Sequence, residues 1–186
     1  MIFLVALVVG LIFGAVDQYL GTLHVTLRLG WWTLPVSQMS ALWLLVPFLV
    51  GGTQERSVRA ALVGLVATFA ALSGYLLMGY GPAEGHPFTD VIHGASGWAR
   101  SNVPWIVGGA VIGPLFGYLG ARWRTRRSAL AAAVVAGSFL LEPLVRVATG
   151  RLLEPTWIWA AEAFAGAALG AVFIATRRRG PAHVRE

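Results

Sequence analysis

The sequence predicts an all-α fold, a polytopic membrane helix bundle with six transmembrane helices. Hydrophobic residues make up 57% of the 186-residue chain and charged residues only 12%, whereas soluble domains average about 25% charged residues. Six apolar runs are long enough to approach or exceed the thickness of a hydrocarbon core of about 30 Å, at about 1.5 Å per helical residue. Most basic residues fall in short segments between these runs. We therefore expect one transmembrane domain over residues 1–176 and a basic cytoplasmic tail over residues 177–186.

The first predicted crossing, residues 1–20, begins with an apolar run like that of a signal peptide. It has no basic n-region and no small-residue cleavage pattern, so we expect it to be retained as a helix. Gly10 and Gly14 have the spacing that lets two membrane helices approach closely, although glycine is also simply frequent in such helices. The other expected crossings are residues 36–52, 60–78, 104–121, 128–150 and 155–176.

Two of the connecting segments carry structural signals. Residues 21–35 include the adjacent Trp31 and Trp32, and tryptophan favours the headgroup level of a bilayer. Residues 79–103 form the longest polar segment, in which residues 90–100 are expected to form a short surface helix.

Arginine placement predicts the orientation of the helices. All 14 basic residues are arginine, and cytoplasmic loops of membrane proteins carry an excess of such charge. With six crossings, three basic segments lie on the same side of the membrane. Both termini are therefore expected on the cytoplasmic side of a bacterial inner membrane. The net charge is +6, but the arginines are spread over short loops and are not gathered on one solvated face, as nucleic-acid binding would require. Their distribution therefore reflects membrane topology. The arginines of the expected cytoplasmic side are Arg56, Arg59, Arg122, Arg124, Arg126, Arg127, Arg177, Arg178, Arg179 and Arg185.

Ionisable residues inside the apolar runs indicate where a site lies. Glu142 and Arg146 fall in the fifth predicted crossing, Glu162 in the sixth and Asp17 in the first. Such a group costs at least about 2.5 kcal/mol at the centre of a membrane helix, so it usually faces a partner or a wet cavity. Along their helices Asp17 lies about 24 Å and Glu142 about 21 Å from the inner end, with Glu162 at similar depth. We expect the three acids to meet in one polar layer beneath the extracytoplasmic surface.

Other polar and aromatic residues at that depth are expected to line an outward-facing pocket. Alternatives stay open at single positions: tryptophan at this level is often only an interfacial anchor, Arg146 can serve only to neutralise Glu142 as its i,i+4 partner, and Asp17 can simply cap a helix end. Trp31 and Trp32 would stand at the rim of the pocket. The predicted substrate-binding residues are Arg146, Gln18, Gln38, Tyr75, Trp105, Trp157 and Trp159.

Several kinds of site lack their signatures. The chain has no cysteine, which excludes disulfides and thiolate chemistry. It contains no HExxH or comparable histidine spacing, no phosphate-binding loop, no dinucleotide fingerprint and no nucleophile elbow. We therefore expect neither a metal nor a cofactor.

Three stretches resemble a family of small bacterial multi-pass integral membrane proteins of unassigned function. They are GAVDQYLG, then SALWLLVPFLVGG with an arginine-containing loop and a helix ending in GYLL, and finally GGAVIGPLFGYLGARWRTRR leading to FLLEPLVR. The resemblance covers most of the chain, supports the architecture and singles out Glu142. Its members look to have Gly-Gln in place of Asp17-Gln18, so it gives Asp17 no support. It implies no mechanism.

The first functional hypothesis is an enzyme for a lipophilic, isoprenoid-like substrate. Carboxyl groups in apolar surroundings are harder to ionise, which equips one to donate a proton and another to accept it. Glu142 or Glu162 would be the acid and Asp17 its counterpart, while tryptophans and Tyr75 would stabilise a carbocation. The predicted reaction is cyclisation or isomerisation, similar in kind to that of small membrane-bound terpene cyclases.

The second hypothesis is transport or solute capture, by a carrier or by the substrate-binding membrane subunit of an importer. Arg146 would hold a carboxylate ligand, proton coupling would use the intramembrane acids, and the Gly10 and Gly14 face would dock a partner. The third is a structural membrane protein whose acids only stabilise helix packing.

Overall fold

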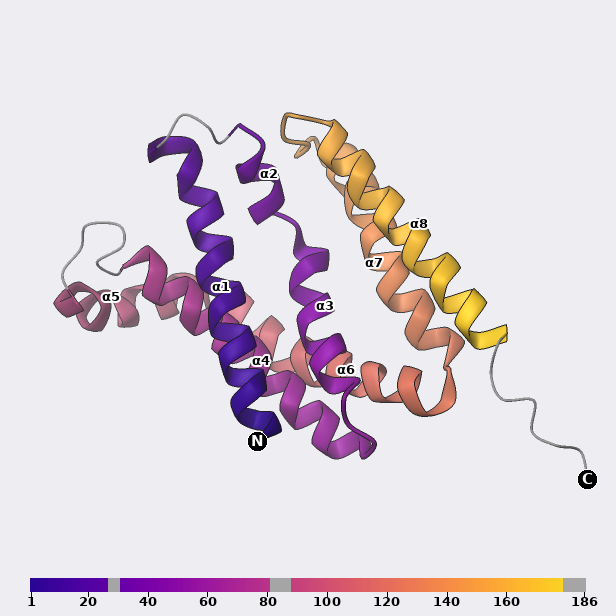
Figure 1. The fold of residues 1–186 in the computed structure, drawn as a ribbon. Coiled ribbons are helices and arrows are strands. Elements are labelled where there is room, and N and C mark those ends of the chain that lie inside the picture. Colours follow the sequence, from indigo (N-terminus) through magenta and orange to yellow (C-terminus); the bar gives the residue numbers. More distant parts are fainter. Residues whose placement is uncertain (27–30, 81–87, 179–186) are drawn as a thin grey trace, which may run out of the picture.

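The computed structural model describes residues 1–26, 31–80 and 88–178, and within these ranges every regular element is a helix (Figure 1). The predicted all-α fold is confirmed. A short helix was expected over residues 90–100 and is present as α5. The elements are α1 (Ile2–Thr26), α2 (Thr33–Ser37), α3 (Ser40–Gly51), α4 (Ser57–Gly79), α5 (Phe88–Ser101), α6 (Val103–Arg126), α7 (Ala129–Ala148) and α8 (Trp157–Arg178).

Within the described ranges, five helices are long and apolar enough to cross a membrane, namely α1, α4, α6, α7 and α8. They coincide with five of the six predicted crossings. Their outer surfaces carry large apolar side chains, among them Ile12, Leu141 and Phe164, which are 60%, 59% and 76% exposed. Because soluble proteins rarely expose such extensive apolar surface, these helices indicate a lipid bilayer as the environment.

The crossing predicted over residues 36–52 is not one continuous helix. The structure has the short helix α2, then a break at Gln38 and Met39, and then the 12-residue helix α3. Met39 has an extended backbone, with φ −74° and ψ 103°, which interrupts the helical hydrogen bonding. Since 12 residues rise only about 18 Å, α3 alone is shorter than a hydrocarbon core of about 30 Å.

Helices α1 and α4 lie side by side and touch through their backbones. A Cβ atom on Gly14 would lie 1.8 Å from the carbonyl oxygen of Ala71, and one on Gly10 would lie 2.3 Å from that of Ala67. The close approach predicted from the glycine spacing therefore occurs, but inside the chain. This corrects the expected use of the Gly10 and Gly14 face, because α4 covers it and leaves no room there for a partner protein.

Small residues also join α6 to α3 and α4. A Cβ atom on Gly64 of α4 would lie 2.4 Å from the carbonyl oxygen of Gly113, and one on Gly51 of α3 would lie 2.3 Å from that of Gly117. Helices α7 and α8 form an antiparallel pair beside this group (Figure 1). A core cluster that includes Phe48, Phe116, Val135 and Phe173 connects α3 and α6 with α7 and α8. The break between α2 and α3 thereby comes to face α7.

Candidate functional site at the break between α2 and α3

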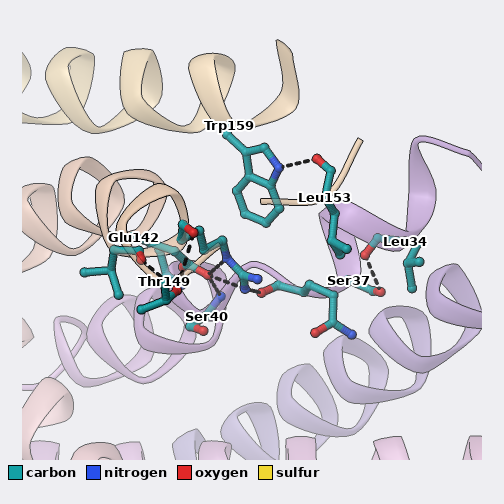
Figure 2. Close-up of polar contacts among 11 residues, drawn as sticks. Leu34, Ser37, Ser40, Glu142, Thr149, Leu153 and Trp159 are labelled. Carbon is teal, nitrogen blue, oxygen red and sulfur yellow. Dashed lines mark hydrogen bonds and ion pairs between the residues drawn. The ribbon is translucent and has the colours of Figure 1, made fainter. Parts of the chain in front are cut away.

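Glu142 of α7 caps the first turn of α3. The first N–H groups of any helix have no acceptor within the helix itself. Here Oε1 of Glu142 accepts the backbone N–H of Ser40 at 2.9 Å, and Oε2 accepts that of Ala41 at 2.8 Å (Figure 2). A carboxylate also suits the partial positive charge of a helix N-terminus. An intramembrane acid thus satisfies backbone groups that the break leaves open.

Arg146 serves the other side of the same break. It lies one turn after Glu142 on α7, and its Nε and one terminal nitrogen donate to Oε1 of Glu142 at 3.0 and 2.8 Å. It also donates to the main-chain carbonyl of Gln38. The pair therefore provides an acceptor to the start of α3 and a donor to the end of α2. Non-helical backbone at membrane depth needs this kind of protein partner, because lipid offers none.

Trp159 brings α8 to the ion pair. The guanidinium carbon of Arg146 lies 4.4 Å from the centroid of the Trp159 ring, within the range of a cation–π interaction. The indole N–H donates to the carbonyl oxygen of Leu153 at 2.7 Å (Figure 2), and the side chain is only 2% exposed. Trp159 therefore holds Arg146 in place together with Glu142.

Glu162 is the fourth member of this cluster. It follows Trp159 by three residues on α8, is 3% exposed, and has no hydrogen-bond partner for either carboxyl oxygen among the described residues. Its carboxyl group faces that of Glu142, with which it interacts through both charge and a shared proton, and it is attracted by the charge of Arg146. A buried polar group without a partner costs about 1–3 kcal/mol. Such groups are rare in native structures, and a role in chemistry or binding is one of the usual reasons for them.

Asp17 lies in a second group on α1, α3 and α4. It is 5% exposed and accepts a hydrogen bond from the indole of Trp43, whose ring centroid lies 5.3 Å from that of Phe13 and 6.1 Å from that of Tyr75. Among the described residues no three histidine, aspartate or glutamate side chains form a group that could hold a metal ion. Asp17 therefore contacts α3 at Trp43, whereas Glu142 contacts the start of the same helix at Ser40 and Ala41. The common level expected for the three acids stays a prediction.

The remaining predicted residues divide between these groups and the surface. Gln18 lies against Gly79 of α4, on the Asp17 side. Gln38 contributes its carbonyl to Arg146. Four of the predicted tryptophans are largely exposed, namely Trp105 at 68%, Trp31 at 63%, Trp157 at 57% and Trp32 at 43%. These four rings therefore do not enclose a pocket around the acids.

The sequence-based prediction missed the backbone N–H groups of Ser40 and Ala41 and the side chain of Trp43. A serine at the start of an apolar helix is a signal for a helix N-terminus, so Ser40 could have marked the start of α3. No comparable signal points to Trp43.

Several apolar helices, each with the length of a membrane span, and a buried polar cluster between α3, α7 and α8 define a multi-pass helical membrane protein. The chain belongs to the family of unknown function DUF6518, whose model matches residues 1–185. The family membership expected from the sequence is thereby confirmed. No curated protein and no solved structure matches the chain.

Proposed function

We propose that the protein binds and transports a small solute that carries a carboxylate, and that the site is the break between α2 and α3. The observation that supports this is the set of donors around Glu142. Two N–H groups at a helix start and the guanidinium of Arg146 converge on one carboxylate. Helix N-termini and arginine forks are the usual ligands of carboxylates and phosphates. The carboxylate of a solute has the same charge and shape, so it can take the place of the Glu142 side chain.

Glu162 is the reason why we expect binding of the solute carboxylate to be coupled to the uptake of a proton. When a solute carboxylate occupies Arg146, two carboxyl groups of the protein remain beside it, those of Glu142 and Glu162. Two like charges and a third from the solute cannot share one guanidinium in apolar surroundings. One proton taken from the aqueous side onto this pair keeps the charge of the site constant as the anionic solute enters. Each transported anion is then accompanied by one proton.

The proposed topology has six crossings, with α2 and α3 together as the discontinuous one. In this topology both termini lie on the cytoplasmic side of a bacterial plasma membrane. Ser40 lies about 18 Å from the cytoplasmic end of α3. Transporters commonly place the N-terminus of a broken half-helix near the bilayer midplane, directed at an anionic group. The chain would be one unit over residues 1–176.

The test uses purified protein in two formats. Thermal stabilisation in detergent is compared for succinate, glutamate and lactate against succinamide, which has the same skeleton without charge. Uptake of any stabilising carboxylate is then measured in proteoliposomes with and without an inward proton gradient. We expect R146Q to lose stabilisation, E162Q to keep it but lose the effect of the gradient, and E55Q, at an exposed position, to match the wild type. Stabilisation of R146Q equal to that of the wild type would disprove the proposed site.

A second candidate is acid-catalysed cyclisation or isomerisation of an isoprenoid-like substrate. It is favoured by one observation, a buried carboxyl group at Glu162 that has no hydrogen-bond partner among the described residues and follows Trp159 by one helical turn. Incubation with farnesyl and geranylgeranyl substrates, followed by mass spectrometry of extracted hydrocarbons, tests it. A product that is formed by the wild type and by E55Q but not by E162Q supports catalysis over transport.

A further inference from the structure

A separate hollow lies at the other end of α3, away from the break. It has a volume of about 400 Å³ and lies where the C-terminal ends of α3 and α6 meet. The two backbones are in contact there, since a Cβ atom on Gly120 would lie 2.0 Å from the carbonyl oxygen of Phe48. This contact leaves the longer side chains of both helix ends to form the walls.

The walls present two fixed guanidinium groups. Arg124 donates to the main-chain carbonyl of Thr53, which holds it across the end of α3. Arg127 ends α6 in a left-handed conformation, with φ 47°, and its guanidinium carbon lies 5.3 Å from the centroid of the Trp123 ring. In the part of the chain that the structure describes, neither arginine forms an ion pair with a carboxylate. Each guanidinium has five N–H donors, so most of them stay available.

The chemistry of these walls suits a phosphate that is attached to an apolar tail. Arginine forks bind phosphate through paired hydrogen bonds, and basic clusters next to membrane helices bind anionic lipid headgroups. Leu49, 58% exposed, continues the wall along the apolar side of α3. We propose that this hollow binds the phosphate headgroup of an anionic glycerophospholipid, with Arg124 and Arg127 on the phosphate and the acyl chains along α3.

Native mass spectrometry of the full-length protein tests the proposal. Protein released from nanodiscs of phosphatidylglycerol and phosphatidylcholine with identical acyl chains is scored for retained lipid. Each basic residue near a membrane surface strengthens anionic-lipid binding by about fivefold, so we expect R124Q/R127Q to lose about twenty-five-fold in preference for phosphatidylglycerol. The single variant R127Q keeps the bond to Thr53 and should lose about fivefold. The control is R56Q/R59Q, which removes the same charge at two exposed positions outside the hollow.

Three outcomes distinguish a lipid site from a site for free phosphate and from a general effect of charge. Equal losses in R124Q/R127Q and R56Q/R59Q would mean that only overall charge matters and would overturn the proposal. Displacement of the lipid by inorganic phosphate at millimolar concentration would assign the site to free phosphate instead. Wild-type retention of phosphatidylglycerol that inorganic phosphate does not displace, weakened in R127Q, supports the lipid site.

Discussion

Oε1 of Glu142 accepts the backbone N–H of Ser40 at 2.9 Å, although the two residues are 102 positions apart in the chain. This hydrogen bond joins the middle of α7, a helix with the length of a membrane span, to the start of the shorter helix α3. It explains how a helix can begin inside the apolar part of the bundle without leaving its first N–H groups bare. It also defines the site at which we propose that a solute carboxylate competes with the protein's own acid.

Replacement of Glu142 should destabilise the protein strongly. Glu142→Ala removes the acceptors of Ser40 and Ala41 and leaves Arg146 without its counter-ion. The side chains of Arg146 and Glu142 are only 17% and 10% exposed, so the loss should approach about 3–5 kcal/mol, the cost of removing one partner of a fully buried ion pair. Glu142→Gln keeps one acceptor oxygen and should lose less. Unfolding of purified protein in mixed micelles measures both, with Glu55→Ala as the exposed control, which should change stability by less than about 0.5 kcal/mol.

A double-mutant cycle on Glu142 and Arg146 should show strong coupling. Residues that share a hydrogen-bonded ion pair typically couple by about 0.5–3 kcal/mol. We expect the double variant E142Q/R146Q to be less destabilised than the sum of E142Q and R146Q, because it leaves no charge of the pair without its partner. Additive losses would mean that the two side chains act independently and that the ion pair contributes little.

Trp159→Phe isolates the indole N–H from the aromatic face. Phenylalanine keeps a ring over Arg146 but loses the hydrogen bond to the Leu153 carbonyl, which is 2.7 Å long, so we expect a loss of about 1 kcal/mol. The matched change at an exposed ring of the same helix, Trp157→Phe, should have almost no effect. Thermal unfolding of the two variants side by side makes the comparison. Similar losses for both would argue against a specific role for the bond.

Two glycine substitutions should act in opposite directions. In Gly14→Ala the new methyl would lie 1.8 Å from the Ala71 carbonyl oxygen, so α1 and α4 must separate and stability should fall by about 1–3 kcal/mol. In Gly137→Ala the new methyl meets no atom within 4 Å, and alanine in a helix is favoured over glycine by about 0.5–1 kcal/mol. Unfolding midpoints that rise or fall together in both variants would contradict the packing of α1 on α4.

Glu162→Leu should separate stability from function. It replaces a buried carboxyl group that has no hydrogen-bond partner among the described residues with an apolar side chain. Stability should therefore stay the same or rise by about 1–3 kcal/mol, while proton-coupled uptake is lost. Such a trade-off is typical of functional positions. A large loss of stability in Glu162→Leu would instead indicate that the carboxyl group has a structural partner.

Local composition was enough to predict the apolar helices and the membrane environment, because hydropathy and length act residue by residue along the chain. It was also enough to select Glu142, Arg146 and Glu162, since charge inside an apolar run stands out in any sequence. Asp17 stood out for the same reason, yet depth along a helix says nothing about which neighbour the helix packs against. Depth alone therefore could not show that Asp17 bonds to Trp43 of α3.

Only the tertiary structure decided that the segment from Val36 to Gly52 is broken at Gln38 and Met39. Ser37, Gln38 and Ser40 make the composition polar at the break, but the groups that make the break stable come from α7, about a hundred residues later. Inside a helix bundle, a backbone carbonyl and two N–H groups can lack partners within their own helix only where a side chain from elsewhere in the chain forms hydrogen bonds with them. Whether those bonds form depends on how the helices pack, which single-sequence patterns do not contain.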